Sequence, residues 1–174
     1  SIESLKQVCD ARPGETIFGM TMIVFKGRTI LVADTNVQDF PSPERLVAVS
    51  KSCVRISKLF GFEPKVAFLS HSTFGKPLSR NTRHVRDAIE KLKKEKVDFD
   101  FDGEMQPDVA LNPIYQEIYP FSKIVGKANI LIMPALHSAA ISTKLMKEYG
   151  GAKLIGPLLI GLGLPIEVAP LRSS

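Results

Sequence analysis

The chain has 174 residues, enough for one domain of ordinary size or a large part of two. Its net charge of +5 favours an anionic partner, but Trp is absent and no aromatic side chains interleave with the basic ones, which argues against nucleic-acid binding. No apolar run approaches the ~20 residues of a membrane span, and the N-terminus lacks a signal peptide's apolar segment. Cys9 and Cys53 stand in no metal-like or redox-like spacing, so free thiols and a cytoplasmic location are predicted.

The first part of the chain is predicted to form a β-hairpin followed by a helix. Ile17 to Phe25 is apolar and β-prone, a Lys-Gly-Arg connection follows, and Thr29 to Ala33 is the second strand. Ser42-Pro43 is typical of a helix start, with a hydroxyl cap and Pro at the first helical position. Apolar side chains at steps of three and four then predict one buried helix face, formed by Leu46, Val49, Cys53, Ile56 and Phe60.

A short apolar run near the middle of the chain ends abruptly in a polar loop. Val66 to Leu69 is expected to be a buried parallel strand, and the loop contains Ser70, His71, Ser72, Thr73 and Gly75. A helix pattern starts near Arg80, with Val85, Ala88, Ile89 and Leu92 inside and Arg83, Arg86, Glu90 and Lys94 facing water. Open α/β sheets bind ligands where a strand gives way to such a loop and helix.

The rest of the chain continues the alternation of strands and helices. Strands are predicted over Val97 to Phe101, Asn129 to Met133 and Leu154 to Ile160, with one more over Ile166 to Ala169. Helices are predicted over Pro113 to Tyr119 and Ser138 to Tyr149. This order predicts an α/β three-layer sandwich with a mostly parallel sheet and an N-terminal β-hairpin.

The polar loops after three of these strands are expected to gather at one edge of the sheet. They carry Ser70, His71, Ser72, Thr73, Asp102, Glu104, Gln106, Asp108, His137 and Ser138. A metal site would use His71, His137 and a carboxylate, without the spacing that usually marks such sites. A Ser–His nucleophile would lack the Gly-x-Ser-x-Gly elbow, and Gly161-Leu-Gly163 is not a dinucleotide fingerprint. Asp102 and Glu104 fit either acid–base work or the ordering of a loop.

Several segments resemble the phosphate acetyl/butyryl transferase family. They are Val66-Ala-Phe-Leu-Ser-His-Ser-Thr-Phe-Gly75, residues 98–113 (DFDFDGEMQPDVALNP), residues 128–134 (ANILIMP) and residues 155–162 (IGPLLIGL). Within the family, Pro134-Ala-Leu-His-Ser-Ala-Ala-Ile141 is similar to the phosphotransacetylase-like C-terminal part of bacterial NADP-dependent malic enzymes, as are Gly19-Met-Thr and Ala33-Asp-Thr. The resemblance spans nearly all of the chain, and the motifs occur in the right order.

The resemblance implies a phosphotransacetylase/isocitrate-dehydrogenase-like fold and an incomplete module. Residues 1–174 would be one fragment of a two-lobed unit, with about 14–160 as an inserted lobe and about 161–174 returning toward a missing first lobe. Family acetyltransferases carry a Ser-Arg pair after the last strand and an Asp further on. Here Pro170 takes the place of the Ser, and Arg172 is one position out of step. The resemblance therefore implies no catalytic residue in this chain.

The resemblance also implies a regulatory and oligomerising role in a malic enzyme, whose other domains would decarboxylate malate oxidatively with NADP and Mg or Mn. Acetyl-CoA or another acyl-CoA would be an allosteric inhibitor, and the chain would form a homodimer within a larger oligomer, with no cofactor, metal, nucleic acid or membrane of its own. The implied ligand-binding residues are Ser70, His71, Ser72, Thr73, Gly75, Asp102, Glu104, Gln106 and Arg172, with Lys65 and Arg80 as further phosphate contacts. The alternatives are an active phosphate acetyl- or butyryltransferase, with Arg172 stabilising charge, and a purely structural dimerisation lobe.

Overall fold

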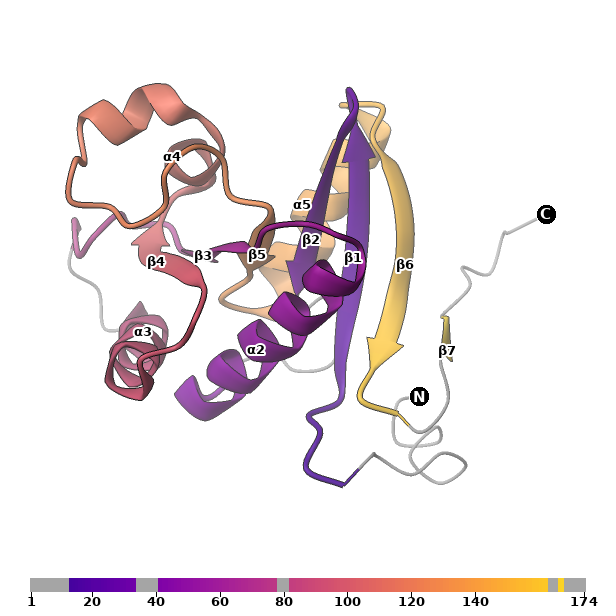
Figure 1. Ribbon diagram of the computed structural model, residues 1–174. Helices are drawn as coiled ribbons and strands as arrows, with labels where there is room; N and C mark the ends of the chain where they lie inside the picture. The colour runs from indigo at the N-terminus through magenta and orange to yellow at the C-terminus, as the bar shows by residue number, and fades with distance from the viewer. Residues whose placement is uncertain (1–12, 34–40, 78–81, 163–165, 168–174) are drawn as a thin grey trace.

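The computed structural model describes residues 13–33, 41–77, 82–162 and 166–167. Helices and strands alternate along these residues, as the sequence predicts (Figure 1). In chain order the elements are β1 (Phe18–Phe25), β2 (Arg28–Ala33), α2 (Pro43–Leu59), β3 (Lys65–Leu69), α3 (Arg83–Glu95), β4 (Asp100–Met105), α4 (Pro107–Leu111), the 3-10 helix η2 (Pro113–Glu117), β5 (Ile130–Ile132), α5 (Leu136–Glu148), β6 (Lys153–Ile160) and β7 (Ile166–Glu167).

The described strands form one sheet in the order β4-β3-β5-β2-β1-β6-β7. Strands β4, β3, β5 and β2 are parallel neighbours, while β1 is antiparallel to both β2 and β6. Because β6 is antiparallel to β1, it has the same direction as β4, β3, β5 and β2. Strand β7 is antiparallel to β6. Five of these seven strands therefore share one direction. The mostly parallel sheet and the N-terminal hairpin, β1 with β2, are confirmed.

Helices cover both faces of the sheet and make it the middle of three layers. Figure 1 shows α2 in front of the strands β1 and β2 and α5 behind them. On one face, α2 and α3 pack buried side chains such as Val49, Cys53 and Leu92 against the sheet. On the other face, Val109 of α4 and Ala139 of α5 pack against residues of the opposite side of the strands. The predicted three-layer sandwich is confirmed.

Helix α2 begins as its sequence predicts and ends one residue earlier than its apolar pattern does. The Ser42 side chain caps the helix by accepting a hydrogen bond from the backbone N–H of Arg45, at 3.2 Å. Leu46, Val49 and Cys53 are buried, which confirms most of the predicted stripe. Phe60 is an exception, because it follows the last helical residue and is 54% exposed. The chain turns away there, at Gly61, which has a φ of +75°.

The largest difference from the predicted elements lies around β4. The strand was expected over Val97 to Phe101, but it runs over Asp100–Met105, so Asp102 and Glu104 lie in the strand and not in a loop. Asp, Gly and Glu are poor strand formers, yet β3 pairs with this segment in parallel and supplies its hydrogen bonds. The following helix α4 was not predicted. The helix predicted over Pro113 to Tyr119 is the shorter η2.

An exposed ion pair joins the first turn of α2 to α3. The Nζ of Lys91 lies 2.8 Å from Oε1 of Glu44. The hydrogen bond from Lys91 is the largest of the effects that hold the pKa of Glu44 at about 2, below its ordinary 4.5. A carboxyl group with a lowered pKa in the folded state stabilises the fold above its unfolded pKa. This contribution should disappear as the pH falls from about 4.5 to about 2.

We therefore expect Glu44 to remain ionised at about pH 3.5, where an unpaired Glu would be mostly protonated. The Lys91→Gln variant should move the titration midpoint of Glu44 up toward 4.5, and added salt should do the same in the parent protein. Carbon-13 NMR of the Glu44 side-chain carboxyl measures this midpoint. Lys94→Gln is the matched control and should leave it unchanged; equal shifts in both variants would contradict the assigned pair.

Candidate functional site

The loop after β3 is held against β4 by backbone hydrogen bonds. The N–H of Ser70 donates to the carbonyl of Met105 at 2.9 Å, and the N–H of Phe74 donates to the carbonyl of Glu104 at 2.7 Å. Thr73 and Lys76 exchange two backbone hydrogen bonds, which closes a tight turn. The loop that the sequence singled out is thus a braced structure at the carboxyl end of a buried parallel strand.

The centre of the site is the carboxylate of Glu104. This side chain is fully buried, and its Oε1 accepts hydrogen bonds from the Ser72 hydroxyl at 2.7 Å and from the Gly75 N–H at 3.2 Å. The guanidinium of Arg86 completes the set, with Nη1 at 3.1 Å from Oε1 and 3.2 Å from Oε2. A buried carboxylate is tolerated when it is paired with a cation and hydrogen-bonded, and Glu104 has both.

Arg86 belongs to this site, although its side chain was predicted to face the solvent. Its side chain is only 29% exposed, and Nη1 also donates to the hydroxyl of Thr82 at 2.6 Å. The prediction was wrong because Arg86 lies at the border of the apolar face of α3, next to Val85 and three residues before Ile89. A buried Glu in the neighbouring strand requires a cationic partner. That requirement is the signal that could have identified Arg86 once β4 was correctly placed.

The carboxylates of Asp102 and Glu104 lie on opposite faces of β4, although they are two residues apart. The pairing of β3 with β4 shifts register between Phe68 and Leu69, which places one extra residue in β4. The Asp102 carboxylate accepts hydrogen bonds from the N–H of Gly103 at 2.9 Å and from the N–H of Lys123 at 2.8 Å. Asp102 therefore anchors the segment after η2 and does not share a cleft with Glu104.

The other predicted site residues have varied positions. Gln106 donates from Nε2 to the carbonyl of His71 at 2.7 Å, and its N–H donates to the Thr73 hydroxyl at 3.2 Å. The Ser70 and Ser72 hydroxyls are 3.3 Å apart and buried. These polar groups brace the loop from within, while the His71 side chain is exposed.

Of the further predicted phosphate contacts, the structure describes Lys65 alone, and it does not lie at this loop. Lys65 lies at the start of β3, at the opposite end of the strand from Ser70, and its Nζ donates to the carbonyl of Val125 at 2.6 Å. Arg80 and Arg172 lie outside the described residues. The carbonyl of Pro134 lies 3.2 Å from Nε2 of His84, which brings the loop after β5 to the start of α3. The side chains of His137 and Ser138 belong to the first turn of α5.

A pocket of about 430 Å³ opens beside the braced loop. Arg86 and Lys93 of α3 supply its cations, and Glu90 and Glu104 supply its carboxylates; Phe74, Gly75, Ile89 and Gly103 complete the lining. Lys93 donates to Glu90 at 2.7 Å, which lowers the pKa of Glu90 below its ordinary value.

The described residues contain no group of three His, Cys, Asp or Glu side chains suited to a metal. Within that same part of the chain, every helix is too short or too polar to cross a membrane.

Comparison with known proteins identifies related sequences and folds. The chain is 43% identical to an NADP-dependent malic enzyme of Rhizobium meliloti over 174 residues, which are 100% of this chain and 23% of that protein. It is 36% identical to a phosphate acetyltransferase of Treponema pallidum over 177 aligned positions, 90% of this chain and 53% of that protein. A crystal structure of a phosphotransacetylase from Streptococcus pyogenes superposes with a TM-score of 0.90 at 29% identity, covering 99% of this chain and 54% of that one.

These coverages mean that the chain spans about a quarter of the malic enzyme's length, corresponding to its C-terminal part, and about half of the phosphate acetyltransferase. The α/β sandwich agrees with the fold of the matched structure. The pattern of the family described as phosphate acetyl/butaryl transferase matches residues 1–171, nearly the whole chain. The chain therefore belongs to the phosphate acetyl/butaryl transferase family.

Proposed function

We propose that this chain is the phosphotransacetylase-like regulatory and oligomerisation part of an NADP-dependent malic enzyme, and that it binds acetyl-CoA as an allosteric inhibitor. The observation that carries the proposal is the 43% identity to a malic enzyme over all 174 residues. The remaining domains of that enzyme would convert malate to pyruvate in the cytoplasm, with NADP and a Mg or Mn ion. This part would contribute a dimer contact and no catalytic residue.

The pocket beside the β3 loop is the proposed place for one end of acetyl-CoA. Its volume of about 430 Å³ lies within the range of ligand pockets, and its lining includes two cations, Arg86 and Lys93, that pair with the carboxylates of Glu104 and Glu90. The hydroxyl of Ser72 already donates to Glu104, so Ser72 and its neighbours would shape the loop and leave the direct contacts to the cations. Because the chain spans about half of a phosphate acetyltransferase, the other wall of the site would come from residues outside it.

Inhibition would require acetyl-CoA to bind two states of the whole enzyme with different affinities. A coupling free energy of ~1–3 kcal/mol corresponds to about a 5- to 150-fold change in affinity.

The alternative function is transfer of an acetyl or butyryl group between CoA and phosphate. The 36% identity to a phosphate acetyltransferase over 90% of this chain is the observation that supports this alternative function.

Calorimetric titration of acetyl-CoA into the full-length protein tests the proposal, together with assays of NADPH formation from malate and of acetyl phosphate formation from acetyl-CoA and phosphate. Binding that inhibits malate oxidation without acetyl phosphate formation supports the regulatory function. Acetyl phosphate formation supports the alternative. Without any binding, both functions are rejected, and a structural oligomerisation part remains.

The Lys93→Gln variant should weaken acetyl-CoA binding to the full-length protein about 5-fold. A partly exposed contact between an ammonium group and a phosphate contributes about 1 kcal/mol, which corresponds to this change in dissociation constant. The matched control is Lys94→Gln, which removes the same charge from the same helix outside the pocket. Calorimetry measures both. Equal effects of the two substitutions would show that the pocket does not hold the anionic part of acetyl-CoA.

A further inference from the structure

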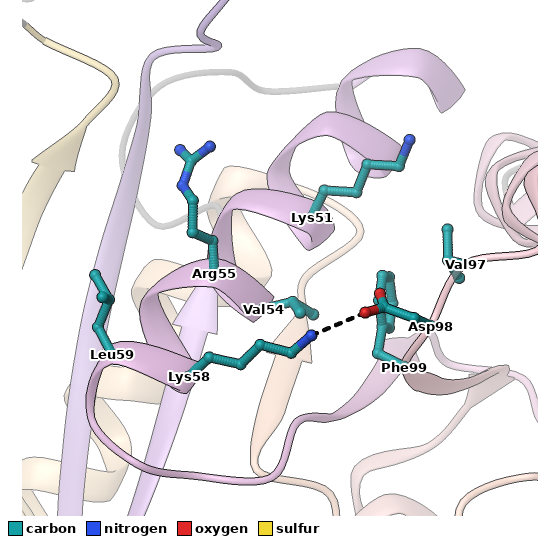
Figure 2. A pocket seen from close by; sticks show the side chains of 8 residues that line it. All are labelled: Lys51, Val54, Arg55, Lys58, Leu59, Val97, Asp98 and Phe99. Carbon is teal, nitrogen blue, oxygen red and sulfur yellow. Dashed lines mark hydrogen bonds and ion pairs between the residues drawn. The ribbon is translucent and has the colours of Figure 1, made fainter.

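A second pocket, of about 490 Å³, lies between the later turns of α2 and the segment that leads into β4 (Figure 2). Its lining includes Val97, Asp98 and Phe99, which precede the start of β4, whereas Ser70 follows the end of β3. Because β3 and β4 are parallel, the two pockets lie at opposite ends of these strands. The second pocket is therefore separate from the site proposed for acetyl-CoA.

Three cationic side chains of α2 line this pocket on one side. Lys51, Arg55 and Lys58 follow one another at steps of four and three, which places them on one side of the helix. Figure 2 shows the three side chains extending from α2, with Lys58 reaching across to Asp98. Among the lining residues Asp98 is the one carboxylate beside three cations, and the carboxylate partners of Lys51 and Arg55 lie outside the lining.

The floor of the pocket is apolar and firmly placed. Val54 is 5% exposed and belongs to the core beneath α2. Phe99 packs edge-on against Phe101 of β4, with ring centroids 5.8 Å apart, and Val97 lies beside it in the lining. A planar or branched apolar group can pack against such a floor while its charged end reaches the cations.

Each of the three cations has a carboxylate partner that an anion can replace. Lys51 pairs with Glu95, Arg55 with Glu15 at 2.8 Å, and Lys58 with Asp98 at 3.1 Å. The three cationic side chains are 45%, 58% and 48% exposed, and exposed ion pairs contribute only ~0–1 kcal/mol each. Exchanging them for a dianion costs little.

The position of Asp98 indicates where the anion would lie. The hydrogen bond from Lys58 lowers the pKa of Asp98 below its ordinary value, so this carboxylate stays ionised near neutral pH and repels a second anion. An incoming anion is thereby directed toward Lys51 and Arg55. An Arg guanidinium presents two parallel donors that suit phosphate oxygens.

We propose that this pocket binds a phosphate monoester that carries a compact apolar or planar group. A phosphate monoester is close to a dianion at neutral pH, so it pairs more strongly than a single carboxylate with the cations that line the pocket. The volume of about 490 Å³ accommodates a small organic phosphate and lies within the usual range for ligand pockets.

The test uses phenyl phosphate as the probe, titrated by calorimetry into the full-length protein that contains this chain. We expect a dissociation constant in the millimolar range or below and binding of inorganic phosphate at least about 5-fold weaker, because it lacks the ring. The Lys51→Gln/Lys58→Gln variant should bind phenyl phosphate at least about 10-fold more weakly. Lys51→Arg/Lys58→Arg should retain binding, because both charges remain.

The matched control is Lys94→Gln/Lys147→Gln, which removes two positive charges outside this pocket and should bind phenyl phosphate like the parent protein. Arg55→Gln is a second variant, and it should also weaken binding if the double substitution does not fold. The proposal is overturned if phenyl phosphate does not bind, if inorganic phosphate binds as well, if both double Gln variants behave alike, or if acetyl-CoA displaces the probe competitively. Competitive displacement would place the probe in the pocket beside Arg86.

Discussion

The Arg86→Met variant is expected to lose about 3–5 kcal/mol of folding free energy, because it leaves a buried carboxylate without its cation. Glu104 has a fully buried side chain, and Arg86 is its cationic partner, at 3.1 and 3.2 Å from the two oxygens. The remaining donors, Ser72 and Gly75, are neutral and do not compensate the charge. The variant therefore buries a charge that has no cationic partner.

Urea-induced unfolding measures this loss, and Arg83→Met is the matched control. Arg83 lies on the same helix, but it is 80% exposed and 3.8 Å from Asp87, so its removal should cost less than about 1 kcal/mol. Equal losses in the two variants would contradict the role of Arg86 as the counterion of Glu104.

A double-mutant cycle with Glu104→Gln separates this ion pair from the rest of the network. Glu104→Gln keeps an oxygen that can accept from Ser72 and Gly75 but removes the charge that Arg86 faces. The combined loss of Arg86→Met and Glu104→Gln should be smaller than the sum of the single losses, because each removes the same interaction. Additive losses would show that Arg86 stabilises the fold by packing alone.

The sequence predicted the layers of the fold because their signals are local. The cap at Ser42, the stripe of Leu46, Val49 and Cys53, and the apolar run of β3 each depend on neighbouring residues. The bounds of β4 were predicted wrongly because its residues Asp100–Met105 are largely polar, and because its pairing with β3 joins segments far apart in the chain. Local propensity does not contain such a pairing.

The position of the predicted loop is confirmed, whereas its charged partners were incompletely predicted. The run from Ser70 to Gly75 lies at the carboxyl end of β3, where the topology places it. The partners of that loop were harder to predict, because a one-residue shift in β4 decides which face each carboxylate takes. Glu104 turns toward Arg86, while Asp102 turns toward Lys123, and no spacing rule in the sequence distinguishes the two.

Gly103→Ala is expected to destabilise the protein by about 2–5 kcal/mol, because a side chain has no room at this point of β4. Gly103 has a φ of +143°, and a Cβ there would lie 2.6 Å from the carbonyl oxygen of Phe68 and 3.0 Å from its Cβ. Phe68 is fully buried and its backbone belongs to β3, between two parallel neighbours. The clash therefore falls on atoms that cannot move without breaking the sheet.

The matched control for Gly103→Ala is Gly75→Ala, which also has a positive φ, +80°, but whose added methyl group would meet no atom within 4 Å. That variant should cost only the backbone strain, about 1–2 kcal/mol. The difference between the two losses, measured by urea unfolding, isolates the close approach of β4 to β3. Since Gly103 lies between Asp102 and Glu104, its displacement should also disturb both carboxylates, and the loss should exceed that of Gly75→Ala. Equal losses would mean that β4 can move away from Phe68 without cost, and that the position of Glu104 beside Arg86 does not depend on the pairing of these strands.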